Sequence, residues 1–252
     1  MTDTAVEKTL AVLEALADHS RITDIARVTG LPKSTVHRLL QAMVDRGFAA
    51  VRSDGGYLAG PKVLVMAGKV LRPVDTVERA RPALRALREE SSCTVHMAMV
   101  VGDELVYVDK VEADKPYRMP SRLGMSLSVH CSAIGKAVLG SMGPVESDAM
   151  VARLRLVGRT PNTITTEERL RAEVAEVRRT GYGFDDEENE VGIRCVGAAI
   201  RDHTGAVVGG ISASTLAMEH TMAQLTALGP RVLSAANTVS TALGYVSPGA
   251  GQ

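Results

Sequence analysis

The sequence predicts an α+β protein made of a small helical N-terminal domain, a short linker helix and a larger C-terminal domain. Three observations lead to this expectation. Helical and extended stretches occur in blocks, and the extended stretches pair as antiparallel hairpins instead of alternating strictly with helices. Basic residues are concentrated near the N-terminus. Two prolines, Pro61 and Pro73, bracket a short helical stretch between the two parts.

The composition is that of a folded protein. The chain has 252 residues and 45% hydrophobic content, which is enough to bury a core and argues against disorder. The N-terminus has no basic segment followed by an apolar run, and no apolar stretch approaches membrane-spanning length. We therefore expect a cytoplasmic protein with no membrane partner.

The cysteines suggest neither a disulfide framework nor a zinc site. There are three, they lie far apart, and none belongs to a C-x-x-C pair. Motifs for nucleotide phosphates, dinucleotides, serine nucleophiles and zinc proteases are also missing from the sequence. We expect reduced thiols, no metal, no cofactor and no catalytic activity.

The zero net charge hides an asymmetry. Residues 1–72 carry ten Lys and Arg against seven Asp and Glu, whereas residues 73–252 carry nineteen against twenty-two. Within 27–72 the ratio is eight basic to two acidic residues. A basic cluster on a small domain suits a polyanion, and the scarcity of aromatic residues favours duplex nucleic acid over a single strand.

The N-terminal elements are predicted in the order helix, turn, helix, hairpin. Apolar residues recur at helical spacing over residues 4–18. Thr23 is expected to cap a second helix that runs to Val28, Gly30 ends it, and Pro32 fits the first turn of a third helix. Two extended runs then surround the turn residues 53–56. This order is that of a winged helix-turn-helix.

The third helix separates an apolar face from a polar one. Val36, Leu39, Leu40 and Met43 share the apolar face. The polar face suits a major groove, because Arg can pair with guanine, Gln with adenine, and hydroxyl groups with phosphates. The candidate DNA contacts are Lys33, Ser34, Thr35, His37, Arg38, Gln41 and, from the hairpin, Arg52.

The stretch LADHSRITDIARVTGLPKSTVHRLLQAMVDRGFAAVRSDGGYLAGPKVL resembles the winged helix of the IclR family of bacterial transcription regulators. The family pattern combines an LxxIAxxTGLPKSTVHRLLxxLxxxGF run with Y-x-L-G close to the wing. This sequence has YLAG instead, so Ala59 stands where the pattern has leucine. The prolines at 61 and 73 divide the chain into a winged helix over 1–60, a linker helix over 61–73 and a larger domain over 74–252, for which the resemblance implies effector binding and oligomerisation.

Helices and hairpins are predicted to alternate in blocks through the larger domain. A helix over 76–92 precedes two strands over 94–111 that turn at Gly102 and Asp103. Further strands are predicted at 117–120 and 125–131, helices at 132–141, 146–155 and 166–180, a hairpin over 195–214 that turns at 202–205, and a long helix over 219–243.

Two further stretches resemble the same family. LGMSLSVHCSAIGKAVLG is similar to its G-x-x-x-PLHxTAxGKAxLA pattern, and GYGFDDEENEVGIRCVGAAI to its GYxxDxEExxxGxxCxAxPI pattern. The resemblance spans residues 4–245 and implies a GAF/PAS-like domain that holds a small effector. The implied effector contacts are Ala133, Ile134, Asp185, Cys195, Ser212 and Ser214, and Met119 is a further candidate for the pocket wall.

The residues themselves support part of this assignment. Ser212 and Ser214 share one face of an extended strand, so two hydroxyls can converge on one ligand. Backbone N–H groups at the start of the helix near Ala133 suit an anionic group, so we expect a carboxylate, aromatic or aliphatic. The β-branched Ile134 is expected to narrow the pocket.

The remaining acidic, cysteine and histidine residues are expected to be solvated or structural and to contact no effector. We expect Asp186, Glu187 and Glu188 to form a solvated loop, and Cys93, Cys131 and His130 to be structural.

The function expected from the sequence is that of a sequence-specific transcription regulator, a repressor more than an activator. Its binding to double-stranded operator DNA would be modulated by the effector, and it would act as a homodimer or homotetramer in a bacterial cytoplasm. The alternative is an enzyme or a thiol redox sensor built on the C-terminal domain, using Cys195 or a His130–Asp185 metal pair.

Overall fold

The structure is a computed structural model that describes residues 4–70, 75–102 and 104–246. The chain forms two compact units, Met1–Val74 and Asp75–Gln252. Each unit has a hydrophobic core of its own.

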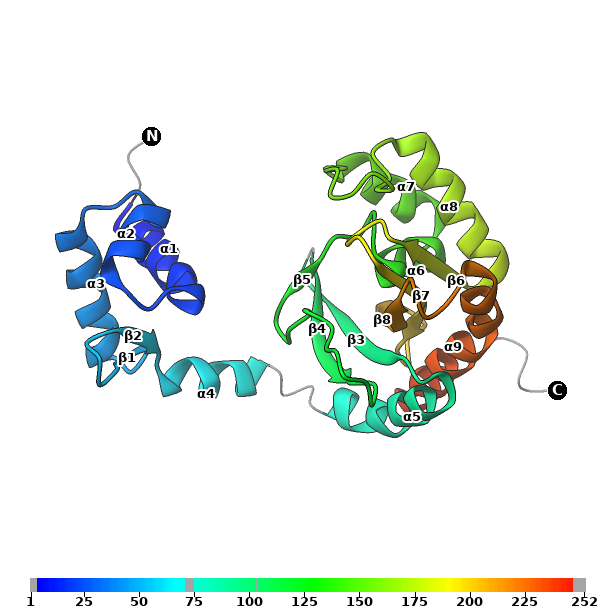
Figure 1. The fold of residues 1–252 in the computed structure, drawn as a ribbon, viewed down its shortest axis with the longest axis horizontal. Helices are drawn as coiled ribbons and strands as arrows, with labels where there is room; N and C mark the ends of the chain where they lie inside the picture. The colour runs from blue at the N-terminus through cyan, green and yellow to red at the C-terminus, as the bar shows by residue number, and fades with distance from the viewer. Residues whose placement is uncertain (1–3, 71–74, 103, 247–252) are drawn as a thin grey trace. The chain divides into compact units, whose positions relative to one another are not determined.

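The N-terminal unit is a helix-turn-helix followed by a two-stranded wing (Figure 1). Thr4 and Glu7 form a capping box that starts the first helix. The second helix begins at Ile22 with Arg21 at its N-cap, so the prediction that Thr23 caps it was wrong by two positions. Gly30 ends that helix with a φ of 67°, in the left-handed region where glycine is favoured. The elements are α1 (Ala5–Asp18), α2 (Ile22–Thr29), α3 (Lys33–Asp45), β1 (Ala49–Val51), β2 (Tyr57–Ala59) and α4 (Pro61–Val70).

One hydrophobic cluster holds these elements together. The apolar face predicted for α3 is buried, and it packs against α1, α2 and the wing. The predicted hairpin is present, with Ala50 paired to Leu58. Residues 71–73 of the expected linker helix lie outside the described residues. The cluster consists of Val12, Ala15, Leu16, Ile25, Ala26, Val36, Leu39, Leu40, Met43, Ala49 and Tyr57.

The C-terminal unit is built on a six-stranded antiparallel sheet in the order β5-β4-β3-β8-β7-β6. Helices cover both faces of this curled sheet (Figure 1). The elements are α5 (Asp75–Ser91), β3 (Thr94–Val101), β4 (Glu104–Val111), β5 (Ser126–Leu127), α6 (Ala133–Ser141), α7 (Pro144–Arg153), α8 (Glu167–Thr180), β6 (Tyr182–Asp186), β7 (Ile193–Arg201), β8 (Val207–Leu216) and α9 (Met222–Ala242).

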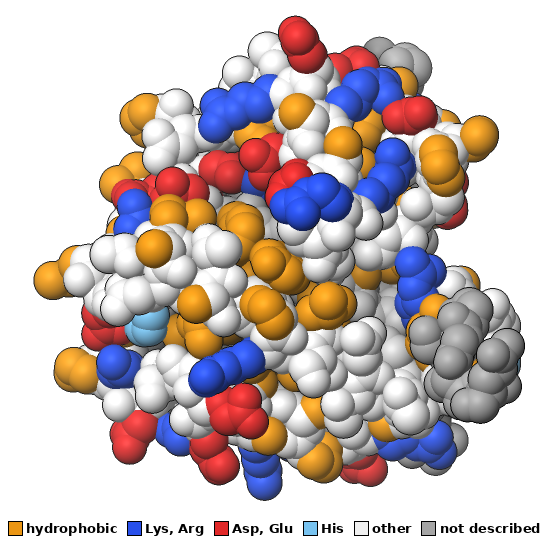
Figure 2. All heavy atoms as spheres, turned by 90° about the vertical axis from the view of Figure 1, so that its right-hand side faces the viewer, with side chains coloured by type: hydrophobic (Ala, Val, Ile, Leu, Met, Phe, Trp, Pro, Cys, Tyr) orange, Lys and Arg blue, Asp and Glu red, His pale blue; other side chains and the backbone are white. Residues whose placement is uncertain are grey.

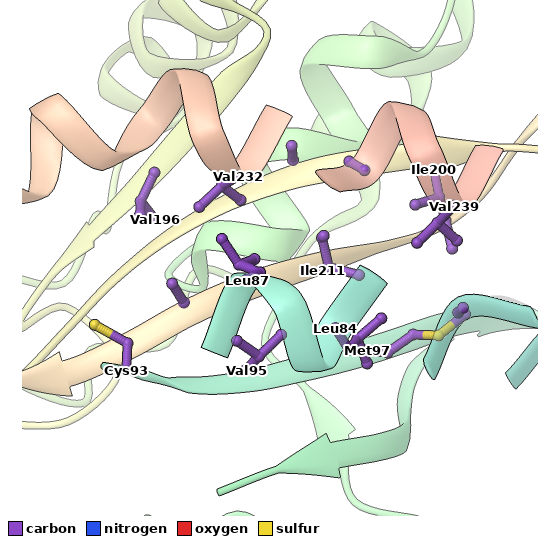
Figure 3. Close-up of a cluster of buried hydrophobic side chains, with 14 of the residues drawn as sticks. Leu84, Leu87, Cys93, Val95, Met97, Val196, Ile200, Ile211, Val232 and Val239 are labelled. Carbon is purple, nitrogen blue, oxygen red and sulfur yellow. The ribbon is translucent and has the colours of Figure 1, made fainter. Parts of the chain in front are cut away.

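Alternate residues of the central strands face opposite layers. Val95 and Met97 of β3 and Ile211 of β8 point into the core formed with α5 and α9 (Figure 3). The residues between them, such as His96, face the layer that contains α6. The sheet therefore has one mainly apolar face, where the buried Asp109 of β4 pairs with Arg81 of α5, and one face that carries the polar groups of the cavity.

Helix α6 lies very close to the second face of the sheet. Every residue from Ala133 to Gly140 is buried. A Cβ atom at Gly197 would lie 2.9 Å from the carbonyl carbon of Ala133, and one at Gly210 would lie 2.8 Å from the Ile134 side chain. Glycine at both strand positions is what allows this approach.

Several predicted elements of this unit differ in the structure. Residues 117–120 are not a strand, and the strand expected over 125–131 is reduced to β5. The carbonyl groups of Met119 and Ser121 are bonded by the Lys110 side chain instead of a neighbouring strand, whereas main-chain bonds to β4 begin only at Gly124 and Met125. Strand β6 was not predicted. The turn at 202–205 is confirmed by bonds between Asp202 and both Gly205 and Ala206, and Asp103 lies outside the described residues.

Acidic and basic side chains are interspersed on the outer face of the C-terminal unit that Figure 2 shows. Exposed pairs on α8, such as Arg179 with Glu176, follow this pattern. Across the described part of the chain, no helix is both long and apolar enough to cross a membrane.

Candidate functional site

The polar face of α3 is open to solvent. Lys33, Ser34, His37, Arg38 and Gln41 are exposed, and Thr35 is half-buried. The opposite, apolar face fixes the helix to the core, so the exposed face has a defined orientation on its unit. This arrangement can insert a helix into a major groove.

The wing adds two contacts that constrain the predicted residues. The amide nitrogen Nε2 of Gln41 donates a hydrogen bond of 2.8 Å to the hydroxyl of Tyr57 at the start of β2. Arg52 is exposed and lies 3.5 Å from Asp54 in the wing turn. Gln41 therefore connects α3 to the wing, and its carbonyl oxygen and second N–H are left to meet a base.

A cavity of about 220 Å³ lies between the C-terminal sheet and the start of α6. This volume is below the range of about 300–1,000 Å³ for drug-sized ligands, so it suits a small metabolite. The structure brings all seven predicted effector residues to its wall: Met119, Ala133, Ile134, Asp185, Cys195, Ser212 and Ser214.

The pairing of the strands explains why residues so distant in sequence meet here. Asp185 of β6 pairs with Cys195 of β7, which pairs with Ser214 of β8. Directly paired residues point to the same face of a sheet, so these three side chains form a row. A second row runs from Gly197 through Ser212 and His96 to Lys110.

The start of α6 forms the opposite wall. The hydroxyl of Ser132 caps the helix by accepting a bond of 3.1 Å from the N–H of Gly135. The N–H groups of the first helical turn have no partner within the helix, and they carry partial positive charge. Ala133 and Ile134 lie at this end and line the cavity. An anionic group is favoured at this wall.

Asp185 is held at the sheet edge by the turn that follows it. Its side chain is 3% exposed, and Oδ1 accepts bonds from the N–H groups of Glu188 at 2.8 Å and Asn189 at 3.2 Å. Burial raises the pKa of Asp185 to about 7, against the opposing effect of these two bonds. The carboxyl group is therefore poised to change its charge near neutral pH.

The expectation that Asp186, Glu187 and Glu188 form a solvated loop was wrong for Glu188, whereas Asp186 and Glu187 are half-buried. Glu188 is 5% exposed and its Oε1 lies 2.6 Å from Nζ of Lys136, which is completely buried in α6. Asp186 and Glu187 both pair with Arg194. Glu187 adopts a φ of 58°, which lets the chain turn back at this point.

A neighbouring loop fixes the same turn from outside. The hydroxyl of Thr160 donates to the carbonyl of Glu187, and that of Thr163 to the carbonyl of Glu188, both at 2.6 Å. Arg159 donates to the carbonyl of Asn189 at 3.2 Å and to the hydroxyl of Ser128 at 3.0 Å, and its side chain lines the cavity. Arg159 places a cation beside the cavity.

Sequence reasoning missed several residues of the cavity wall, among them His96, Tyr107 and Arg159. The rings of His96 and Tyr107 lie with their centroids 5.1 Å apart on neighbouring strands. Their alternation with buried apolar residues along β3 and β4 could have placed them on the cavity face. Arg159 lies in an irregular loop and carries no periodic signal.

The thiols and His130 have surroundings that favour structural roles. Cys93 and Cys131 are buried, and burial raises the pKa of all three thiols. His130 Nε2 lies 3.1 Å from the carbonyl oxygen of Val157. Within the described residues, no group of three or more His, Cys, Asp or Glu side chains could hold a metal ion.

The Lys136–Glu188 pair can be tested by removing one charge or both. We expect Lys136→Met to lower the free energy of unfolding by about 3–5 kcal/mol, because it leaves a buried carboxylate without its partner. The double variant Lys136→Met/Glu188→Leu should recover a large part of this loss. Urea unfolding followed by circular dichroism measures both, with Arg179→Met, which breaks an exposed pair, as the control. Equal losses in the single and double variants would show that the unpaired charge is not the cause.

The raised pKa of Asp185 predicts a pH dependence of stability. The folded protein retains a proton on Asp185 between about pH 4 and 7, whereas the unfolded chain releases it. The contribution to stability is therefore complete below about pH 4 and is lost as the pH rises through about 7. The difference in unfolding free energy between the wild type and Asp185→Asn should fall with pH by up to about 1.4 kcal/mol per unit. A difference that stays constant from pH 4 to 8 would contradict the assignment.

Comparison with known proteins finds the same family for both units. The family profile "IclR helix-turn-helix domain" matches residues 5–53, and "Bacterial transcriptional regulator IclR C-terminal" matches residues 68–241. The HTH-type transcriptional regulator XynR of Escherichia coli K12 is 32% identical over 245 residues, covering 96% of this chain and 97% of XynR. The transcriptional repressor IclR of the same organism is 32% identical over 241 residues, covering 93% and 88%.

Solved structures show the same fold. The Thermotoga maritima IclR structure has a TM-score of 0.77 at 31% identity, covering 95% of this chain and 98% of that one. An IclR homologue from Microbacterium hydrocarbonoxydans, solved with 4-hydroxybenzoate, has a TM-score of 0.79 at 22% identity, covering 95% and 99%. The predicted winged helix-turn-helix and GAF/PAS-like domain are thereby confirmed. The chain belongs to the IclR family of bacterial transcriptional regulators.

Proposed function

We propose that this regulator binds a duplex operator through α3 and the wing, and a small carboxylate in the C-terminal cavity. The bound carboxylate changes the affinity for the operator. The observation that carries the proposal is the meeting of seven residues, from five separate parts of the chain, around one cavity of metabolite size.

The exposed face of α3 supports contact with DNA. Arg38 lies at its centre, where a guanidinium can donate two bonds to the N7 and O6 atoms of guanine. Ser34, Thr35 and Lys33 lie in the first turn, where hydroxyl and ammonium groups meet phosphates. His37 and Gln41 extend the same face, and Arg52 extends the wing.

The two ends of the cavity favour different parts of a ligand. The start of α6 and Arg159 attract a carboxylate. Asp185, Ser212 and Ser214 present hydrogen-bonding oxygens on the sheet. A carboxylate that also carries a hydroxyl or carbonyl group satisfies both walls.

A homodimer or homotetramer is part of the proposal. Exposed apolar side chains lie one helical turn apart on α1, where Val6 is 67% and Leu10 52% exposed, and Leu64 of α4 is 75% exposed. A second copy of the chain would cover such residues and would present two recognition helices to a pseudo-palindromic operator. Action as a repressor is supported by the relatives that are named repressors.

The alternative roles find less support in the cavity. A nucleophilic or redox-active cysteine needs a thiolate, and burial raises the pKa of Cys195. The carboxyl group of Asp185 raises the pKa of this thiol further, so it also opposes thiolate formation.

The assignment of DNA binding to one unit and effector binding to the other can be tested with one variant in each unit. We expect Arg38→Ala to weaken binding to the operator about 5- to 150-fold, because a bidentate base contact is worth about 1–3 kcal/mol. Ser214→Ala should leave operator binding without ligand unchanged and weaken the response to a carboxylate. Fluorescence anisotropy with DNA from upstream of the protein's own gene measures both, with a carboxylate panel that includes 4-hydroxybenzoate.

Arg179→Ala, which removes an exposed charge from α8, is the control for Arg38→Ala. Binding that depends on salt but prefers no fragment would overturn the proposed operator contact. Equal losses in Arg38→Ala and Ser214→Ala in both assays would overturn the separation of roles.

A further inference from the structure

His96 connects the floor of the cavity to the segment that covers it. Its Nδ1 lies 3.2 Å from the hydroxyl of Ser214, and its Nε2 lies 2.7 Å from the hydroxyl of Ser121. Ser214 belongs to the central strand β8, whereas Ser121 belongs to the irregular segment 112–125. Both ring nitrogens of a single buried side chain are thus engaged by hydroxyls on opposite walls.

The ring of His96 is neutral. The side chain is 3% exposed, and burial, aided by the nearby charge of Lys110, lowers its pKa to about 3. A neutral imidazole has one N–H donor and one acceptor nitrogen. If one serine hydroxyl donates to the ring, the other must therefore accept from it, so the orientations of the two hydroxyls depend on each other.

The segment 112–125 is held over the cavity mainly by side-chain contacts until main-chain bonds to Tyr107 of β4 begin at Gly124 and Met125. Met119, Pro120, Ser121 and Met125 line the cavity from this side. Lys110 donates to the carbonyl oxygens of Met119 at 2.7 Å and Ser121 at 3.1 Å. These carbonyls have side-chain partners where a strand would have main-chain partners.

The same segment is attached to elements beyond the cavity. Arg88 of α5 donates to the carbonyl of Glu112 at 3.1 Å, and Tyr117 donates to the carboxylate of Glu219, just before α9, at 2.6 Å. Movement of the segment would therefore change the contacts of α5, the first helix of the C-terminal unit.

We propose that His96 is a positioning residue for effector recognition, which couples the hydroxyl of Ser214 to the covering segment 112–125 through Ser121. The proposal rests on the proposed function, in which Ser214 contacts the effector. A ligand that accepts a bond from Ser214, or donates one to it, selects the tautomer of His96 and so strengthens or weakens the hold on Ser121. The effector's hydrogen-bonding character would in this way decide how tightly the cavity is covered.

A ligand-free double-mutant cycle tests this coupling. Amide hydrogen exchange of residues 119–125, read by mass spectrometry in the full-length protein, reports the opening of the segment. Ser214→Ala should speed this exchange about fivefold, since a hydrogen bond contributes about 1 kcal/mol. Ser212→Ala is the matched control, because it removes a hydroxyl from the same face of β8 without a bond to His96. It should leave the exchange unchanged.

The second arm of the cycle uses His96→Gln, whose amide reaches the position of Nε2 but not that of Nδ1. This variant should keep the hold on Ser121, and Ser214→Ala should then add no further change. The segment should open faster in His96→Leu and in Ser121→Ala. Circular dichroism confirms that each variant is folded.

Two results would overturn the proposal. One is an equal effect of Ser214→Ala and Ser212→Ala, and the other is an effect of Ser214→Ala that persists when His96 is Gln. Because the cycle needs no effector and no DNA, its outcome does not depend on whether a carboxylate changes operator binding. Failure of the proposed function is therefore seen separately, in the anisotropy assay.

Discussion

The buried ion pair between Lys136 and Glu188 is the interaction on which the cavity depends. A charge on the inward face of α6 is stable there only because a carboxylate meets it. The half-buried Glu173 of α8 approaches the same ammonium group at 3.4 Å. The pair draws the turn after β6 against the helix, and the turn presents the two N–H groups that hold Asp185. One interaction thus sets the distance between the helical wall and the sheet wall.

Close approach of α6 to the sheet is the second constraint. Gly197 and Gly210 leave space for the helix, and side chains at these positions would push it away. The N-terminal end of α6 then faces the two rows of polar residues that strand register creates. Asp185, Cys195 and Ser214 form one row because β6, β7 and β8 pair in a single register. A slip of one residue would turn every member of the row to the apolar face.

Local signals made the N-terminal unit predictable from sequence. The periodicity of Val36, Leu39, Leu40 and Met43 defines one face of a helix, and the burial of that face in the structure follows directly from it. Six of the seven effector residues, all except Met119, were found through family resemblance, which already contains the information of the fold. Their roles as contacts remain predictions.

The features that the sequence did not predict depend on residues that are far apart in the chain. Nothing near Glu188 indicates that its partner is Lys136, which lies 52 positions earlier in the chain. The last three of four consecutive acids, Asp186, Glu187 and Glu188, were therefore expected to form a solvated loop. Strand β6 ends in two of those acids, so its sequence did not indicate a strand. Residues 117–120 were predicted as a strand, but they bond to the side chains of Lys110 and Glu219.

The most direct test of the carboxylate site is a thermal-unfolding screen with small carboxylates and phenolic acids. A ligand that binds only the folded state must raise the unfolding temperature. We expect at least one compound to stabilise the wild type, and to stabilise Ser214→Ala less at the same concentration. The proposed site would be contradicted if no compound shifted the wild type, or if every shift were unchanged in Ser214→Ala.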